Sequence, residues 1–233
     1  MKKEIYPKTM SNDYDIVLKA YPEHYKLRKE VAEIIRTHIN DNTDTLILEI
    51  GCGTGETTKY ILTETTKTKI IAVDKEKVMI DVLKTNLSEY IDNERLLQII
   101  EDIFNYIKKI GSLSIDCVTS SWTIHNFTRS QRTLLLHEIY RILKPNGIFV
   151  NMDKYVADDK NEEQKSLEKA IENMRKMADK KISDTAIQHE KDDRHPNIIM
   201  KEQEALSEMG KIGFKDITSY TRIGREIVVS GIK

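Results

Sequence analysis

Short apolar runs alternate with segments of helical periodicity over residues 45–153. Five runs predict buried strands at Thr45–Ile50, Lys69–Asp74, Leu96–Ile100, Ile115–Ser120 and Gly147–Asp153. Between them, apolar residues recur at helical spacing and predict helices over 57–65, 77–86 and 130–143. Strands that alternate with helices at this spacing form βαβ units and a mostly parallel sheet. Because the runs are almost uniformly apolar, we expect an α/β fold with helices on both faces of the sheet.

The segment after the fifth run breaks this alternation. Residues 160–182 are highly charged, yet they carry one apolar stripe at helical spacing, formed by Leu167, Ala170, Ile171, Met174, Met177, Ala178 and Ile182. We expect one amphipathic helix here. It either packs on the surface of the domain or covers a ligand site as a cap, and its position after the carboxyl end of a strand favours the cap.

The two ends of the chain add helices and a final pair of strands. Residues 11–40 are predicted to be helical with a break at Pro22, and residues 201–211 predict a further helix. Asp216–Arg222 and Glu226–Ile232 predict two strands joined by a short glycine-containing turn. A turn so short joins only antiparallel strands, so the sheet should be mixed, with an antiparallel member near one edge.

The length of 233 residues fits one domain with an inserted cap. We divide the chain into an N-terminal helical segment (1–44), a core (45–153), a cap insertion (154–200) and a C-terminal helix with a hairpin (201–233) that completes the core.

Composition and charge narrow the class of protein. Lys and Arg number 37 against 38 Asp and Glu, so the chain lacks the positive field of an avid nucleic-acid binder. No apolar run reaches the roughly 20 residues that a bilayer requires, and no apolar stretch follows the charged N-terminus as in a secretory signal. With only Cys52 and Cys117, a reduced cytoplasmic protein without a zinc framework is expected. Monomer and homodimer both remain open.

The most informative segment is the glycine-rich turn after the first predicted strand. Gly51, Gly53 and Gly55 follow a strand and precede a helix, so a polar ligand can approach the backbone and the free N–H groups of the helix. A P-loop is excluded because Glu56 takes the place of its lysine. The dinucleotide fingerprint G-x-G-x-x-G, started at Gly51, would need its third glycine at position 56, where Glu56 stands instead. A nucleoside with a cationic end and no phosphate fits best, because Glu49 would offset the positive charge.

Two carboxylates follow the next predicted strands. Asp74 ends the second strand 19 residues beyond Gly55, a position from which a carboxylate binds ribose hydroxyls. Asp102 follows the third strand, where it either accepts a hydrogen bond from an adenine amine or caps a helix.

Together these residues resemble a known family, the class I S-adenosylmethionine (SAM)-dependent methyltransferases. The turn is similar to the first motif of that family, and the resemblance covers residues 45–153 and 201–233. It rests on Glu49-Ile-Gly-Cys-Gly-Thr-Gly55, Asp74, Glu101-Asp102-Ile103, Asp116-Cys-Val-Thr-Ser120, Tyr140-Arg-Ile-Leu-Lys-Pro-Asn-Gly147 and Gly213-Phe214.

The resemblance implies a Rossmann-like sheet of seven strands whose last strand is antiparallel. It also implies SAM as the cofactor and S-adenosylhomocysteine as the product. Glu49 would lie near the methionine amino group, Asp74 on the ribose, and Asp102 with Ile103 at the adenine. The implied cofactor-binding residues are Glu49, Gly51, Cys52, Gly53, Gly55, Asp74, Lys75, Asp102, Ile103 and Ser120.

The segment after the fourth strand departs from one branch of the family. The Asn/Asp-Pro-Pro-Tyr/Phe motif, typical of enzymes that methylate nucleobase or glutamine amino groups, is replaced by Ser120-Ser-Trp-Thr-Ile-His-Asn-Phe127. This sequence looks more like that of the small-molecule O-, N- or C-methyltransferases. A small-molecule acceptor is therefore expected, and a nucleic-acid partner is not.

His125 is the candidate catalytic base, because imidazole titrates in the useful range and the residue lies just beyond the fourth strand. A structural histidine is the alternative. Candidate substrate contacts are Tyr14, Tyr21, Trp122, Asp153 and Arg194. The His- and Asp-rich segment 189–195 matches no metal motif, so we expect a polar loop and no metal.

Three functions compete. The first is methyl transfer to a small molecule. The second keeps the fold and changes the chemistry, as in a carboxy-SAM synthase linked to tRNA modification, and would need an arginine such as Arg194 or Arg175 for the added carboxylate. The third is a SAM-binding protein without catalysis.

Overall fold

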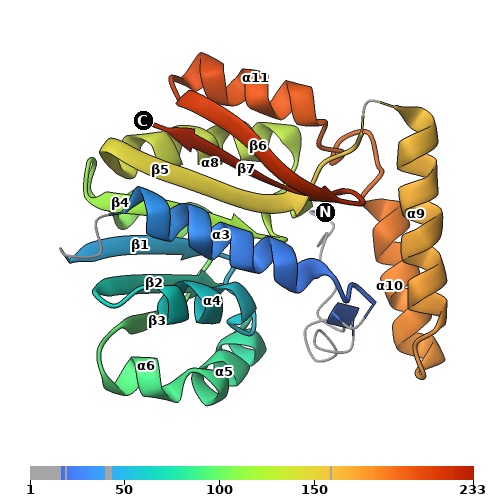
Figure 1. The fold of residues 1–233 in the computed structure, drawn as a ribbon, viewed down its shortest axis with the longest axis horizontal. Coiled ribbons are helices and arrows are strands. Elements are labelled where there is room, and N and C mark those ends of the chain that lie inside the picture. Colours follow the sequence, from blue (N-terminus) through green and yellow to red (C-terminus); the bar gives the residue numbers. More distant parts are fainter. Residues whose placement is uncertain (1–16, 19, 40–43, 158) are drawn as a thin grey trace.

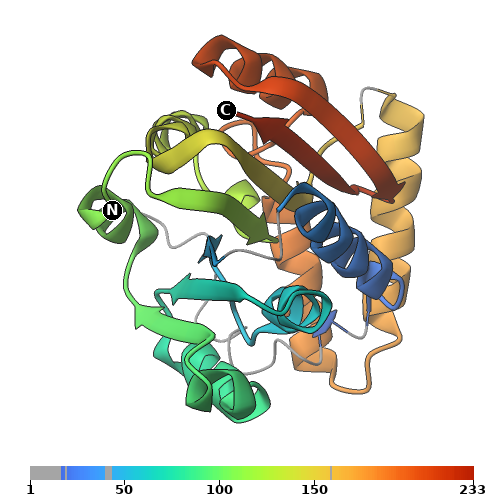
Figure 2. The same cartoon turned by 60° about the vertical axis from the view of Figure 1, so that its left-hand side comes forward.

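A seven-stranded mixed sheet forms the centre of the molecule (Figure 1). The computed structural model describes residues 17, 18, 20–39, 44–157 and 159–233. The strand order is β3-β2-β1-β4-β5-β7-β6. The strands are β1 Thr45–Ile50, β2 Thr68–Asp74, β3 Leu96–Ile100, β4 Ile115–Ser121, β5 Leu143–Lys154, β6 Lys215–Ile223 and β7 Glu226–Ile232. The last strand, β7, runs antiparallel to both of its neighbours, as predicted. Figure 2 shows how the sheet twists from the β3 edge to the β6 edge.

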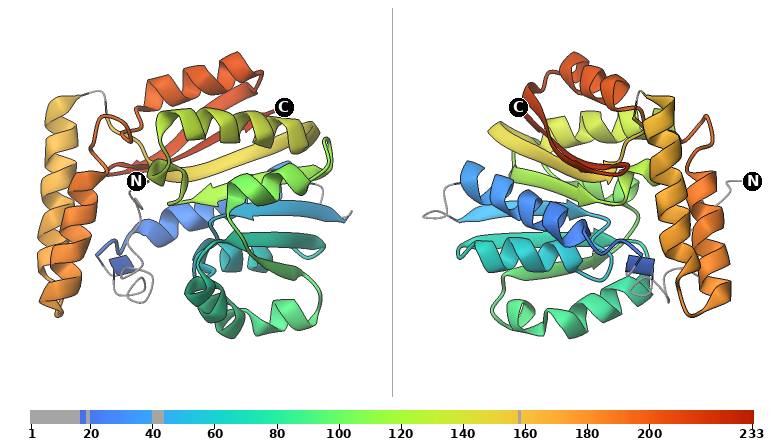
Figure 3. Two further views of the ribbon diagram at one scale, coloured as in Figure 1. Left: turned by 180° about the vertical axis from the view of Figure 1, so that it is seen from behind. Right: turned by 45° about the vertical axis from the view of Figure 1, so that its right-hand side comes forward.

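Helices cover both faces of the sheet and bury an apolar layer on each. One layer contains Leu27 and Ile35 of α3 (His24–His38), with residues of α4 (Glu56–Glu64) and α5 (Lys77–Asn86). The other contains Leu135 and Ile139 of α8 (Arg129–Ile142), with residues of α11 (Glu202–Ile212). Figure 1 is seen from the α3 side and the left panel of Figure 3 from the α8 side. The short elements are α6 Ser88–Asp92, α7 Ile103–Tyr106, η1 Ile107–Lys109 and η2 Ile124–Asn126.

The start of β5 corrects the prediction. The strand predicted over 147–153 begins earlier, because β5 already starts at Leu143. Leu143 pairs with Ile115 of β4, and the register then shifts before Cys117 pairs with Ile148. The positive φ of 62° at Asn146 lies inside this irregularity, so the strand absorbs these residues as a bulge.

Two helices, α9 (Lys160–Arg175) and α10 (Lys180–Asp192), replace the single amphipathic helix predicted over 160–182. A new helix starts because Asp179 caps α10, its side chain accepting a 3.0 Å hydrogen bond from the Ile182 amide. The two helices lie side by side beyond the carboxyl-terminal ends of β4 and β5 (Figures 1 and 3). We call α9 and α10 the cap helices. Within the described residues, no helix is long and apolar enough to cross a membrane.

Candidate active site

The glycine-rich turn joins β1 to α4 and requires its glycines. Gly51, Gly53 and Gly55 have φ angles of 67°, 54° and 89°. A Cβ atom at Gly51 would lie 2.1 Å from Oγ1 of Thr123, so the turn packs directly against the loop after β4. Gly55 precedes α4, and no side chain caps this helix. The first N–H groups of α4 therefore receive no side-chain cap beside the carboxyl end of the sheet.

Asp74 at the end of β2 fixes this turn. Its Oδ2 accepts a 3.0 Å hydrogen bond from the Gly53 amide and its Oδ1 a 2.9 Å bond from the Glu76 amide. Burial raises the pKa of Asp74, and the two amides oppose that rise. Lys75 is exposed and lies 3.8 Å from Glu76, at the rim of the same site. The predicted ribose-binding carboxylate thus lies against the turn.

Glu49 is an almost fully buried carboxyl group at the base of the turn. Its side chain is 1% exposed, and Oε2 accepts a 2.6 Å hydrogen bond from Oγ1 of Thr58 in α4. Desolvation raises its pKa to about 7, and the bond from Thr58 lowers it only in part. Within the described residues, no salt bridge joins Glu49 to a cation. A cationic group next to the turn would supply the missing partner.

A small cavity opens between the turn, α3 and the loop after β4. The residues that line it are Arg28, Glu49, Gly51, Cys52, Thr54, Glu56, Thr57, Ser121, Trp122 and Met152. Burial raises the pKa of the Cys52 thiol, so it remains protonated. The predicted Ser120 does not line the cavity: it is buried, and its hydroxyl donates a 3.0 Å bond to the Ile50 carbonyl. Its neighbour Ser121 faces the cavity instead.

Arg28 is the residue of this cavity that the sequence interpretation missed. It is 8% exposed on the face of α3 that buries Leu27 and Val31, and no ion pair or hydrogen bond joins it to the described residues. An arginine in a helix stripe that is mostly apolar is the signal that could have found it, because such a charge needs a partner. It brings a positive charge into the cavity that Glu49 lines.

Asp102 and Ile103 occupy the start of the short helix α7. Asp102 is exposed, and its Oδ1 accepts a 2.9 Å bond from the Phe104 amide, so it caps α7. Ile103 is 7% exposed and packs in the apolar layer on the α8 side. The capping role is one of the two that the sequence left open for Asp102, and its other oxygen accepts no hydrogen bond from the described residues.

His125 and Asp153 form a buried pair at the ends of β4 and β5. Nδ1 of His125 lies 2.5 Å from Oδ1 of Asp153, and the His125 amide donates a 3.1 Å bond to Oδ2. His125 is 5% exposed and Asp153 is fully buried. Two bonds to one carboxylate fix both the ring and the backbone of His125, which leaves Nε2 as the nitrogen that can exchange a proton.

Trp122 lies between the cavity and the cap. Its φ of 52° is unusual for a bulky residue, a strain that concentrates at functional sites. The indole packs edge-on against Tyr21 and His24, with ring centroids 4.7 and 4.5 Å apart. The Tyr21 hydroxyl donates a 3.1 Å bond to Glu190 of α10. Tyr14, the other candidate tyrosine, lies outside the described residues.

Residues 189–195 do not form the polar loop that the sequence predicted. They continue α10 and its end, and His189, Glu190 and Asp193 are all buried against the core. Ion pairs with the core explain why such polar residues are buried. Arg194 lies 3.1 Å from Glu163 of α9, so the structure places it in an ion pair between the cap helices. Within the described part of the chain, no group of three or more His, Cys, Asp or Glu side chains is arranged to hold a metal.

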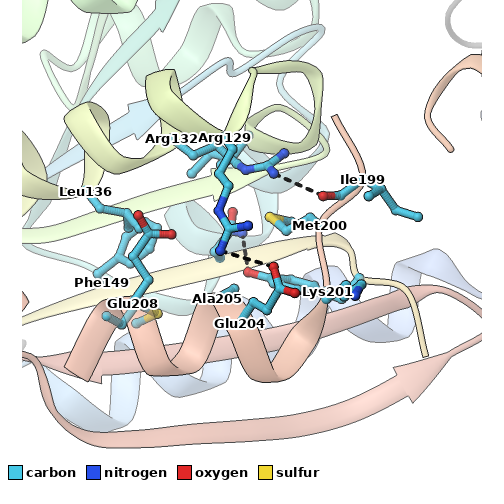
Figure 4. A pocket seen from close by; sticks show the side chains of 14 residues that line it. Arg129, Arg132, Leu136, Phe149, Ile199, Met200, Lys201, Glu204, Ala205 and Glu208 are labelled. Carbon is cyan, nitrogen blue, oxygen red and sulfur yellow. Dashed lines mark hydrogen bonds and ion pairs between the residues drawn. The ribbon is translucent and has the colours of Figure 1, made fainter. Parts of the chain in front are cut away.

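A second cavity lies on the α8 side, between α8, α11 and β5 (Figure 4). Arg129 and Glu204 form a 3.2 Å ion pair at this cavity, and Arg132 donates a 3.1 Å bond to the Ile199 carbonyl. None of the residues predicted for cofactor or substrate lines it. Of the predicted residues, Glu49, Gly51, Cys52 and Trp122 line the cavity beside the glycine-rich turn.

Comparisons with known proteins agree with this geometry. Residues 47–147 match the family model described as a methyltransferase domain. The chain is 28% identical over 149 residues to a carboxy-S-adenosyl-L-methionine synthase of Shewanella sediminis. The aligned residues cover 63% of this chain and 59% of that protein. It is 30% identical over 131 residues to the tRNA N(3)-methylcytidine methyltransferase trm140 of Schizosaccharomyces pombe, covering 54% of this chain and 42% of that protein. The chain thus spans less than two thirds of these relatives.

Solved structures with the same fold include two methyltransferases. The CurJ carbon methyltransferase superposes with a TM-score of 0.64 at 16% identity, covering 88% of this chain and 53% of that one. A structure described as a putative O-methyltransferase from Nostoc punctiforme gives 0.64 at 16% identity, with coverage of 94% and 60%. At these identities the likeness concerns the fold alone.

Proposed function

We propose that the chain is a class I SAM-dependent methyltransferase and that it transfers the methyl group of SAM to a small-molecule acceptor by in-line displacement. The observation that carries the proposal is the cavity beside the glycine-rich turn, which Glu49 and Arg28 both line. A buried carboxyl group and a buried guanidinium complement the ammonium and carboxylate of an amino acid. The methionine part of SAM is such a zwitterion.

The remaining cofactor contacts follow the sheet edge. Asp74, already bonded to the Gly53 amide, would accept from the ribose hydroxyls. Lys75 borders the same end of β2. The other oxygen of Asp102 and the side chain of Ile103 would meet the adenine. The uncapped N–H groups at the start of α4 would contact the cofactor between these two ends.

When bound, SAM supplies an already activated methyl group. The chain then has to align the acceptor and exclude water, and such alignment is worth on the order of 7–11 kcal/mol. SAM would supply the methyl carbon to the acceptor, with S-adenosylhomocysteine as the leaving group. Nε2 of His125 takes the proton of the acceptor, while Asp153 holds Nδ1 and stabilises the imidazolium.

A small acceptor fits the surroundings of His125 better than a nucleic acid does. Trp122 packs against Tyr21, and Tyr21 is bonded to Glu190 of the cap helix α10, so these side chains narrow the space beyond β4 and β5. The insertion and the following helix, residues 154–211, carry 12 Lys and Arg against 14 Asp and Glu, so they offer no basic surface for RNA. A tRNA-modifying relative makes RNA the first alternative to test.

The carboxy-SAM alternative receives less support from the arginines. Such a reaction needs a cation for the added carboxylate, yet Arg194 is paired with Glu163 and Arg175 lies exposed at the end of α9. Neither lines the cavity beside the turn. The third alternative, binding without catalysis, leaves the buried His125–Asp153 pair without a role.

Incubation with methyl-labelled SAM tests the proposal. Transfer of the label to a fraction of cellular small molecules, abolished by Asp74→Ala, supports it. Transfer of the label to tRNA would show that the acceptor is RNA and not a small molecule. A carboxylated SAM product would instead support the carboxy-SAM synthase alternative. Binding of S-adenosylhomocysteine without transfer to any pool would leave a non-catalytic SAM protein.

A further inference from the structure

A buried cluster of charges joins the cap helices to the core. We call it the junction cluster, and it consists of Lys154, Glu163, Glu190, Asp193 and Arg225. Each of its five residues is at most 6% exposed. The two cations come from the core, at the end of β5 and in the β6–β7 turn, and the three carboxylates come from α9, α10 and the end of α10.

Lys154 is the centre of this cluster. Its ammonium lies 2.6 Å from Glu190 and 2.7 Å from Asp193, and 5.6 Å from the centre of the Trp122 ring. Glu190 has a second cation, Arg225, at 2.6 Å. The two carboxylates raise the pKa of Lys154 against the effect of burial, so the ammonium stays charged. One core side chain thus fixes two positions on α10 at once.

The ion pair between Lys154 and Asp193 also places the Asp193 carboxylate next to His125, the proposed base. Oδ2 of Asp193, the atom that meets Lys154, lies 3.8 Å from Nε2 of His125. Asp153 occupies the opposite nitrogen of that ring. His125 therefore lies between one carboxylate of the core and one of the cap, and the second is present only while α10 is docked.

Apolar contacts also hold the cap. In the described residues, the cluster that includes the cap has four buried members, Val17, Ala20, Met174 and Ala186, and the first two lie in the N-terminal segment. Its partly buried members are Tyr21, Ala170, Met177, Ile182 and Ile187. Removing one partner of a buried ion pair is strongly unfavourable, whereas opening the whole interface returns every charge to water. Ion pairs of this kind fix the docked cap in one geometry.

We propose that Lys154 is a positioning residue for the reaction: it holds α10 so that Asp193 faces Nε2 of His125 and stabilises the positive charge that develops there. The proposal rests on the proposed function through the role of His125. The cap contact itself involves no cofactor or acceptor, so the two can be tested separately.

Hydrogen exchange tests the docking without any substrate. In Lys154→Met, the protection of amides 183–193 should fall about 100-fold, because two buried carboxylates lose their shared partner. Protection of β1 and β4 should remain, as should binding of S-adenosylhomocysteine. Lys154→Arg should restore most of the protection, and Lys181→Met, which removes an exposed charge from the same helix, should change it less than about twofold. Wild-type protection of α10 in Lys154→Met would overturn the proposal.

A second variant keeps the test decisive if Lys154→Met disturbs the core. The combination of Glu190→Gln and Asp193→Asn keeps Lys154 and removes its two partners. It should give the same loss of α10 protection with β1 and β4 intact. Protection of α10 equal to the wild type in this variant would also overturn the proposal.

Kinetics test the second part of the proposal, the effect of Asp193 on His125. Asp193→Asn keeps the Glu190 contact to Lys154, so α10 should stay docked while kcat falls at least about tenfold and KM changes less than about threefold. A merely structural role would instead lower α10 protection and raise KM. Unchanged kcat with a docked cap would refute the role of Asp193. If no methyl transfer is found at all, the proposed function fails, and the exchange results still decide whether Lys154 holds the cap.

Discussion

Asp153 holds His125 at two points: Oδ1 lies 2.5 Å from the ring Nδ1, and Oδ2 accepts a 3.1 Å bond from the His125 amide. A fully buried carboxylate therefore sets the tautomer of the ring as well as its position. The pair links the ends of β4 and β5, which are neighbours in the sheet. This arrangement is what allows one imidazole nitrogen to accept a proton in a fixed direction.

Substitution of His125 should remove catalysis and preserve the cofactor site. His125→Gln should lower kcat by about 10²–10⁴-fold, the usual contribution of a general base. Asp153→Asn should have a similar effect, because it favours the wrong tautomer. His137→Gln, on the exposed face of α8, is the matched control and should match the wild type. Full activity of His125→Gln would show that the acceptor needs no base from this residue.

Glu49 should make the empty protein less stable at high pH. Its pKa of about 7 in the folded chain exceeds its usual value of 4.5, so the folded state binds the proton more tightly. The contribution of the protonated Glu49 to the free energy of unfolding is fully present below pH 4.5 and is lost as the pH rises through 7. Glu49→Gln should therefore raise the free energy of unfolding at pH 8 by up to about 3 kcal/mol, and much less at pH 5.

The same substitution should weaken ligand binding. Removing the carboxylate that faces the cofactor ammonium should lower the affinity for S-adenosylhomocysteine about 10- to 100-fold. Denaturant unfolding at both pH values and calorimetry together measure the two effects. A Glu49→Gln protein that is less stable at pH 8 than the wild type would contradict this account of the buried carboxyl.

Gly51 should tolerate no side chain. Gly51→Ala forces a positive φ on alanine and drives its Cβ into Thr123, so we expect a loss of about 2–4 kcal/mol in unfolding free energy and of cofactor binding. Gly111→Ala is the control, because a Cβ there meets nothing within 4 Å. It should change stability by less than about 0.5 kcal/mol. Equal melting temperatures for the two variants would mean that the turn adapts.

Two substitutions of Asp102 should separate its capping of α7 from its proposed contact with the adenine. Asp102→Asn keeps a capping side chain for α7, so the unfolding free energy should change by less than about 0.5 kcal/mol. If the carboxylate also accepts from the adenine amine, the affinity for S-adenosylhomocysteine falls about tenfold. Asp102→Ala should lose both, with about 1 kcal/mol of stability. Unchanged affinity in both variants would leave Asp102 as a helix cap alone.

The core could be predicted from sequence because its strands are apolar on both faces and end at polar or glycine residues. β3 and β7 have the predicted bounds, and Thr128 with Gln131 forms a capping box at the start of α8. The glycine-rich turn and Asp74 were also recognisable, since only a narrow set of residues permits the positive φ angles and the amide contacts observed there.

The cap could not be predicted in the same way. The helix break before Asp179 lies within a continuous apolar stripe, and the stripe carries no sign that the chain reverses. The burial of Glu190 and Asp193 depends on Lys154 and Arg225, which come from other parts of the chain. Arg28 was missed for a similar reason, because its place in the cavity depends on how α3 crosses the sheet.

The most direct test of the account is calorimetric titration with S-adenosylhomocysteine, with NAD as the control ligand. The account predicts binding in the micromolar range to the wild type, at least about tenfold weaker binding to Asp74→Ala and to Arg28→Met, and no binding of NAD. A folded, ligand-free protein that fails to bind S-adenosylhomocysteine, or that binds it equally well without Asp74 and Arg28, would contradict the assignment of this cavity as the cofactor site.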